Sequence, residues 1–320
     1  MYKLIYKEIK KWDNIYIFGH VRPDGDCLGS QFGLKAILEE NFPKKHIVVV
    51  GDKADYVAFL GTPEKENITD EEIKNGLAIV VDCGSADRVS DMRYQTAKKV
   101  IKIDHHIAVG PYGDIAWVEE EKPACAQMIT EFALLNKLKI NEKAALALYT
   151  GIVTDTGRFR FRGVTDTTFW VAGALLNSGA DVEVIDNYLS TEELNIIHYK
   201  GYILENAKFT DCGVVYITIT RDIVKKYNLT DEEAASQVSL LGSIKGYPVY
   251  FLVMEYPSEI RLRIRSRGPR VDKLANKYGG GGHEKAAGGH LNSWEELDSF
   301  VEDINKIAKY YQENGKDLEE

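Results

Sequence analysis

Disulfide frameworks, membrane spans and an excess of positive charge are all missing from this chain of 320 residues. Its four cysteines lie far apart and form no CxxC pair, which argues against both a disulfide scaffold and a zinc knuckle. No signal peptide and no apolar run of spanning length is visible, so we expect a cytoplasmic protein with no membrane partner. The formal net charge is −9, whereas proteins that coat long nucleic-acid duplexes are usually basic.

Short apolar runs alternate with helix-like segments over the first half of the chain. Each run is continuous rather than alternating, as in strands that are buried on both faces. The four predicted strands cover residues 14–19, 46–51, 77–82 and 99–104. This alternation predicts an α/β fold with a doubly wound, mostly parallel sheet.

The pattern changes after about residue 205, where strand-like segments over 213–220, 248–256 and 260–266 are mixed with helices. We therefore predict a catalytic domain over residues 1–190, a connecting helix over 191–204 and a second, smaller α/β domain over 205–320. A cleft between the two domains is expected to hold the substrate.

Acidic residues and histidines collect where the predicted strands end. The carboxyl ends of parallel strands share one edge of a sheet, and ligands bind there. One aspartate at such a position most often caps a helix or closes a turn, but several at corresponding positions predict a ligand site. The members are His20, Asp24, Asp26, Asp82, Asp104, His105 and His106, and Asp155 follows a helix-like run.

Carboxylates combined with neutral imidazoles suit Mn²⁺, Mg²⁺ or Fe²⁺, and Mn²⁺ is favoured where nitrogen joins oxygen. Two such ions lie about 3.5–4 Å apart and share a ligand, usually a carboxylate. The pattern therefore predicts two divalent metal ions, with Mn²⁺ the expected species. We expect the small residues of "PDGDCLGS" to permit a tight turn, so that Asp24 and Asp26 face different ions.

The motifs "HVRPDGDCLGS", "VDCGS", "DHH" and "TDTGRFRF" resemble, in this order, the four motifs of the DHH phosphoesterase family. The segment "GGGGHEKAAGG" resembles the glycine-rich signature of that family's DHH-associated C-terminal domain. The resemblance runs from about residue 15 to about residue 290. It is strongest to small enzymes that degrade very short RNAs and dephosphorylate 3′-phosphoadenosine 5′-phosphate.

The resemblance implies a role for each motif residue. His20 and Asp24 would bind one metal ion, Asp26, His105 and Asp155 the other, and Asp82 both. The catalytic pair would be His106, which contacts the scissile phosphate, and Asp104, which orients a histidine.

A basic segment precedes the glycine-rich one. Strict alternation places Arg261, Arg263, Arg265 and Arg267 on one face of a strand, which predicts an anion site. We expect the glycines to offer backbone N–H groups to a phosphate at a helix N-terminus. The resemblance assigns Arg265, Ser266 and His283 to the substrate site, and Arg160, Gly280, Gly281 and Gly282 complete the predicted substrate-binding set.

These observations predict a metal-dependent hydrolase of short oligoribonucleotides and nucleotide 3′,5′-bisphosphates that uses water activated by two metal ions. A phosphodiesterase for cyclic di-AMP or its linear product is the alternative within the same chemistry. A nucleotide-binding module without turnover is less favoured because a pure binder does not need this ligand set, and a pyrophosphatase should lack "GGGGHEKAAGG". A homodimer is one expected assembly.

Overall fold

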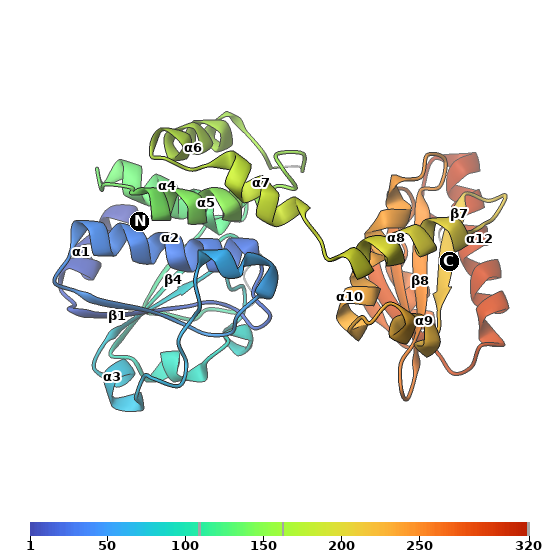
Figure 1. The fold of residues 1–320 in the computed structure, drawn as a ribbon, viewed down its shortest axis with the longest axis horizontal. Helices are drawn as coiled ribbons and strands as arrows, with labels where there is room; N and C mark the ends of the chain where they lie inside the picture. The colour runs from blue at the N-terminus through green and yellow to red at the C-terminus, as the bar shows by residue number, and fades with distance from the viewer. Residues whose placement is uncertain (108–109, 162, 319–320) are drawn as a thin grey trace. The chain divides into compact units, whose positions relative to one another are not determined.

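The computed structural model describes residues 1–107, 110–161 and 163–318. The chain folds into two compact units, Met1–Thr191 and Glu192–Glu320 (Figure 1). Each unit has its own sheet and its own apolar core.

The first unit is built on a sheet of five parallel strands in the order β2-β1-β3-β4-β5. Four of them coincide with the predicted strands, and the prediction of a parallel α/β sheet is confirmed. The short fifth strand at the edge was not predicted. The strands are β1 (Asn14–Phe18), β2 (His46–Val50), β3 (Leu77–Val81), β4 (Lys99–Asp104) and β5 (Ile115–Val118).

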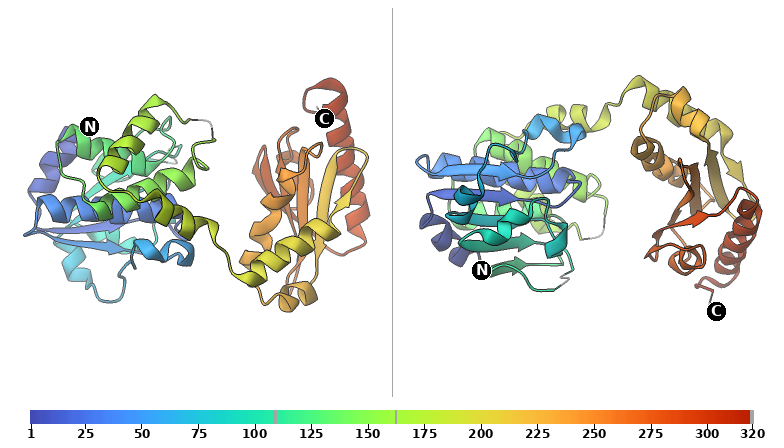
Figure 2. Two further views of the ribbon diagram at one scale, coloured as in Figure 1. Left: turned by 45° about the horizontal axis from the view of Figure 1, so that its top comes forward. Right: turned by 90° about the horizontal axis from the view of Figure 1, so that it is seen from below.

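Apolar residues fill both faces of this sheet. On one face, α1, α2, α4 and α5 pack with the strands into the larger core. On the other face, α3 and a 3-10 turn over Met92–Thr96 cover a smaller core. Figure 2 gives two further views of this unit. The helices are α1 (Tyr2–Lys10), α2 (Gly25–Asn41), α3 (Asp70–Lys74), α4 (Cys125–Leu135), α5 (Glu142–Asp155), α6 (Asp166–Asn177) and α7 (Val182–Ser190).

The strand order reverses beside β1, which lies between β2 and β3. A reversal of this kind opens a crevice at the carboxyl ends of the strands, and ligands bind there in doubly wound folds. His20 comes two residues after the end of β1, and Asp82 directly follows β3. The fold therefore brings these two side chains to the position where the sheet favours a site.

The small residues of "PDGDCLGS" serve helix packing rather than the predicted tight turn, and this part of the expectation is wrong. Gly25 and Gly29 lie inside α2. A Cβ atom on Gly29 would lie 2.5 Å from the carbonyl oxygen of Ala147 in α5, and one on Gly151 would lie 2.8 Å from Oδ1 of Asp26. The chain turns instead at Arg22, which has φ 54°. Close contact between α2 and α5 thus carries Asp155, the last residue of α5, toward Asp26.

The second unit contains a mixed sheet of six strands in the order β10-β11-β9-β8-β7-β6. Only β7 and β8 pair in parallel within it. The strands are β6 (Lys208–Phe209), β7 (Val214–Ile219), β8 (Val249–Glu255), β9 (Ile260–Ser266), β10 (Gly281–His283) and β11 (Ala286–Leu291). The prediction of a second, smaller α/β domain is confirmed.

Helices cover both faces of this second sheet. α11 and α12 pack against one face, while α8 and α10 pack against the other, where Tyr199 and Ile203 of α8 are fully buried. The segment predicted as a connecting helix thus contributes to the core of the second unit. The helices are α8 (Leu194–Asn206), α9 (Arg221–Lys226), α10 (Asp231–Ser236), α11 (Asp272–Lys277) and α12 (Glu296–Asn314). Within the described residues, no helix combines the length and apolar character needed to cross a membrane.

Candidate metal centre

Two histidines at the carboxyl edge of the first sheet are oriented in the same way. Nδ1 of His20 lies 2.9 Å from the carbonyl oxygen of Val21, and Nδ1 of His105 lies 2.9 Å from that of Lys122. A carbonyl oxygen can only accept, so each Nδ1 carries the proton. A neutral ring then has its lone pair on Nε2, which is the arrangement of a histidine ready to bind a metal ion.

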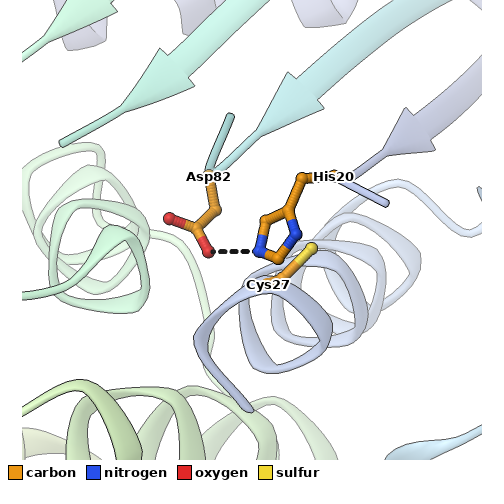
Figure 3. A group of neighbouring side chains, drawn as sticks. All are labelled: His20, Cys27 and Asp82. Carbon is orange, nitrogen blue, oxygen red and sulfur yellow. Dashed lines mark ion pairs between the residues drawn. The ribbon is translucent and has the colours of Figure 1, made fainter. Parts of the chain in front are cut away.

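Asp82 lies between these two rings. Its Oδ2 is 3.6 Å from Nε2 of His20, and its Oδ1 is 3.3 Å from Nε2 of His105; Figure 3 draws the His20 side of this pair. The residue has φ 55°, a backbone conformation that non-glycine residues seldom adopt and that clusters at functional sites. One carboxylate therefore faces both imidazoles, as a ligand shared by two metal ions would.

Asp26 and Asp155 complete the group around His105. Nε2 of His105 lies 3.7 Å from Oδ2 of Asp26 and 3.3 Å from Oδ2 of Asp155. Asp26 has a second role that the sequence did not indicate. Its two oxygens accept the backbone N–H groups of Cys125 and Ala126, at 2.6 and 2.9 Å, so the carboxylate also lies at the N-terminus of α4.

Asp24 lies at the edge of the cluster. Its side chain accepts the backbone N–H groups of Asp26 and Cys27 and so caps α2. The same Oδ1 atom lies 3.8 Å from Nε2 of His20, and just over half of the side chain is exposed. The resemblance assigns Asp24 to the same metal ion as His20. The second carboxylate oxygen of Asp24 takes no part in capping α2.

The charges of the cluster fit divalent cations. Asp82 is 1% exposed, and apart from the ion-pair contact with His105 at 3.3 Å its Oδ1 accepts no hydrogen bond from the described residues, so this buried anionic oxygen depends on a cation for compensation. Burial and the carboxylates of Asp82 and Asp155 raise the pKa of Asp26 well above its usual value. Burial lowers the pKa of His105, but the Asp82 and Asp26 carboxylates outweigh it and raise this pKa to about 10. The raised pKa values of Asp26 and His105 indicate that this cluster of carboxylates favours added positive charge, which bound divalent ions would supply.

Cys27 also approaches this cluster, together with His20 and Asp82 (Figure 3). The thiol is fully buried and donates to the side-chain oxygen of Gln31, at a sulfur–oxygen distance of 3.8 Å. Burial raises its pKa to about 12. A neutral, buried and hydrogen-bonded thiol of this kind behaves as a small apolar side chain.

Asp104 holds the second histidine of "DHH". Its Oδ1 accepts from Nδ1 of His106 at 2.9 Å and from the backbone N–H of the same residue at 3.2 Å. Because Nδ1 is engaged in this way, Nε2 of His106 is left for another partner. The side chain of His106 is 48% exposed while that of Asp104 is fully buried. The geometry is that of a buried carboxylate orienting a histidine at the surface of the site.

Comparison with known proteins identifies the family of this chain. The family sequence model of the DHH family, N-terminal domain, matches residues 14–152, and the sequence model of the DHHA1 domain matches residues 213–310. A bifunctional oligoribonuclease and PAP phosphatase NrnA from Bacillus subtilis is 36% identical over 311 residues, covering 96% of this chain and 99% of that protein. The chain belongs to the DHH family.

Other proteins are also similar to this chain over nearly full length. A protein of the same name from Mycoplasma genitalium is 34% identical and covers 94% of this chain and 96% of its own. The crystal structure of an exopolyphosphatase-related protein from Bacteroides fragilis superposes with a TM-score of 0.86 at 24% identity, covering 98% of this chain and 97% of its own. That last similarity supports the fold.

In the DHHA1 unit, two of the four arginines that the sequence places on one strand face have acidic partners. Arg261 pairs with Glu259, and Nη2 of Arg263 lies 2.9 Å from Oε2 of Glu232. Arg265 is half-buried, donates from Nη1 to the carbonyl oxygen of Ile264 at 2.9 Å and forms no ion pair with the described residues. Burial, followed by the charge of Arg263, lowers the pKa of Arg265. The argument for an anion therefore applies to Arg265, and to the exposed Arg267, which forms no ion pair with the described residues, rather than to the whole row.

The glycine-rich segment does not precede a helix, so the expected helix N-terminus is wrong. The glycines follow the end of α11 and form β10, which pairs with β11. A Cβ atom on Gly280 would lie 1.9 Å from the carbonyl oxygen of Gly288, and Gly282 has φ 141°. Both positions thus require glycine for close backbone contact. Gly281 has more room, since its nearest neighbour would be Oδ1 of Asn276 at 3.3 Å.

The other predicted substrate residues differ in exposure. His283 ends β10 and is exposed, whereas Ser266 is 7% exposed and accepts the backbone N–H of Gly268 at 3.0 Å. Arg160 lies on the turn after α5 and donates from Nε to the carbonyl oxygen of Gly157 at 2.7 Å. The structure thus gathers the predicted metal ligands within the first unit, while most predicted substrate residues belong to the DHHA1 unit.

Proposed function

We propose that this protein hydrolyses phosphoester bonds in short oligoribonucleotides and in 3′-phosphoadenosine 5′-phosphate. The names of its full-length relatives support both substrates. The observation that carries the chemistry is the position of Asp82, whose two oxygens face the Nε2 atoms of His20 and His105. This is the donor arrangement of a dinuclear centre.

We propose that His20, Asp24 and Asp82 bind one divalent ion and that Asp26, Asp82, His105 and Asp155 bind the other, with Mn²⁺ the expected metal. When bound, such ions supply Lewis-acid polarisation of the phosphoryl group and activation of water. The protein itself supplies the rest. The carbonyl oxygens of Val21 and Lys122 fix the two imidazoles, so that the ligands need no rearrangement to bind.

His106 is proposed to contact the scissile phosphate. Its Nδ1–H is held by Asp104, so Nε2 can present a hydrogen bond to a phosphoryl oxygen when protonated. The Asp104 hydrogen bond raises the pKa of His106, which favours the protonated ring. A donor of this kind stabilises the charge that develops on phosphate in the transition state.

The DHHA1 unit is proposed to bind a second phosphate or the base of the substrate. Arg265 has no acidic partner among the described residues, so it is the arginine of β9 that is free to meet an anion. A contact at a fixed distance from the scissile phosphate would select short substrates. The expected cleft remains a prediction of this proposal, as do the substrate-binding roles of Arg160, Ser266, Gly280, Gly281, Gly282 and His283.

Parallel rate measurements test the proposal. The purified protein with Mn²⁺ is given di- to pentanucleotide RNA, a 50-residue RNA, 3′-phosphoadenosine 5′-phosphate, cyclic di-AMP and pyrophosphate at equal concentration. We expect turnover of the short RNAs and of the bisphosphate, and slow turnover per end of the long RNA. Dominant hydrolysis of cyclic di-AMP would favour the alternative phosphodiesterase, and binding without turnover of any substrate would contradict the proposal.

A further inference from the structure

A buried lysine lies directly behind the catalytic pair. Lys102 belongs to β4, two residues before Asp104 on the same face of the strand, and it is 2% exposed. Its Nζ atom lies 3.0 Å from Oδ2 of Asp104 and 3.2 Å from the carbonyl oxygen of Gly84. The ammonium also lies 4.4 Å from the centre of the Tyr112 ring. Lysine is almost never buried to this extent without a partner, because removing an ammonium group from water is costly.

These contacts connect segments on either side of the site. Gly84 lies two residues after Asp82, and Asp104 directly precedes His105. The ring of Tyr112 covers the ammonium, while its hydroxyl donates to the carbonyl oxygen of Cys83. Lys102 thus joins the loop that follows β3 to the end of β4.

Asp104 transmits this contact to His106. Its Oδ1 holds the histidine, while its Oδ2 faces Lys102 and accepts no well-aligned hydrogen bond from the described residues. The ion pair with Lys102 is therefore what compensates the buried Oδ2 atom. Without that charge, the carboxylate would lose the contact that fixes its rotation, and Oδ1 would no longer be held against Nδ1 of His106.

We propose that Lys102 is a positioning residue, which acts through Asp104 to hold the His106 ring in the orientation that meets the scissile phosphate. This inference rests on the phosphoesterase function proposed above. It gives the buried ion pair a role in catalysis rather than in stability. A purely structural role is the competing explanation, and it is not favoured by energetics, because replacing a buried ion pair with apolar groups often leaves stability unchanged.

The matched variants are Lys102→Met, Lys102→Arg and, as a control on the same strand, Lys99→Met. Lys99 begins β4, lies on the opposite face of the strand from Lys102 and Asp104, and forms an ion pair with Asp114 at 3.7 Å. Each variant is measured for Mn²⁺ content, melting temperature, kcat and KM on a dinucleotide. Lys102→Met should lower kcat about 10- to 100-fold. A positioned acid or base contributes roughly 10²- to 10⁴-fold to the rate, and we expect a displaced His106 to lose part of that contribution. KM and Mn²⁺ content should stay near the wild-type values, and Lys102→Arg should restore part of kcat.

An NMR measurement makes the test independent of turnover. In Mg²⁺-loaded protein, the Nδ1 proton of His106 should give a slowly exchanging downfield resonance, assigned by its loss in His106→Gln. Lys102→Met should abolish this resonance and Lys99→Met should keep it. If Lys102→Met does not fold, Lys102→Gln provides the uncharged variant.

Two results would overturn the inference. One is a Lys102→Met variant that keeps both the resonance and a kcat equal to that of Lys99→Met. The other is a loss of kcat that follows a lowered melting temperature and that Lys102→Arg does not restore. A wild-type protein inactive on every substrate would instead refute the proposed function, while the resonance would still report on Lys102.

Discussion

Nδ1 of His105 lies 2.9 Å from the carbonyl oxygen of Lys122, and this contact fixes the ring that faces three carboxylates. The Lys122 side chain is itself held, since its Nζ lies 2.7 and 2.8 Å from the two oxygens of Glu131 in α4. The orientation of a metal-binding histidine thus depends on an ion pair outside the site. Residues that hold a metal-binding side chain in place, without binding the metal themselves, contribute to the affinity of the site for its metal ion.

We therefore expect Glu131→Ala to weaken Mn²⁺ binding by up to about 10-fold, because Lys122 loses its anchor and the carbonyl oxygen behind His105 becomes mobile. Isothermal titration with Mn²⁺ measures the affinity. Glu39→Ala is the control, since Glu39 forms only an exposed pair with Lys35 at 3.8 Å, and such pairs contribute little. Equal affinities of the two variants would show that the ion pair does not support His105.

Metal binding should release protons at neutral pH. The metal-free pKa of His105 is raised to about 10, so its ring is charged at pH 7, whereas a metal ion requires the neutral ring. Burial raises the pKa of Asp155 to about 6. Lowering the pH protonates this carboxyl group, so the apparent affinity should fall as pH falls through about 6. Titrations in buffers of different ionisation enthalpy check this, and a binding enthalpy independent of the buffer would refute proton release.

Gly29→Ala should damage both stability and the site. The new Cβ atom would lie 2.5 Å from the carbonyl oxygen of Ala147, so α2 and α5 must separate. Overpacking of this kind costs about 1–3 kcal/mol of the free energy of unfolding, and the shift moves Asp155 away from Asp26. Denaturant unfolding and metal analysis provide the measurements. Gly173→Ala in α6 is the control, because its Cβ would meet no atom within 4 Å; equal effects of both substitutions would contradict the packing argument.

Arg265→Ala should affect substrate and not metal. A charge-assisted hydrogen bond to phosphate contributes about 1.5–3 kcal/mol, so kcat/KM on a dinucleotide should fall roughly 10- to 150-fold. Bis(p-nitrophenyl) phosphate has no second phosphate and should be affected less. Arg261→Ala, which removes an arginine already paired with Glu259, should change neither rate strongly. If Arg265→Ala lost metal, or lost both activities equally, the DHHA1 unit would not bind substrate in the proposed way.

The sequence predicted those features that depend on local pattern. Continuous apolar runs located β1, β3 and β4, and the parallel sheet then placed His20, Asp82 and His105 at one edge. Features that depend on tertiary contact were out of reach. Nothing in the spacing indicated that Asp26 would accept the N–H groups of Cys125 and Ala126, or that Glu232 would neutralise Arg263.

The two wrong expectations share a cause. In both, glycine was interpreted as freedom of the chain, at Gly29 for a tight turn and at Gly280 for a loop at a helix N-terminus. The structure uses these glycines because another backbone passes close by, at Ala147 and at Gly288. A single sequence does not distinguish a glycine needed for its φ angle from one needed for its missing side chain.

Anomalous diffraction from crystals grown with Mn²⁺ tests the dinuclear centre itself, because it locates each ion without reference to activity. We predict two peaks about 3.5–4 Å apart, one beside His20 and the other beside His105, with Asp82 between them. Both peaks should weaken in Asp82→Asn. A single peak, or two peaks of which neither lies beside Asp82, would contradict the dinuclear centre on which the proposed phosphoesterase function depends.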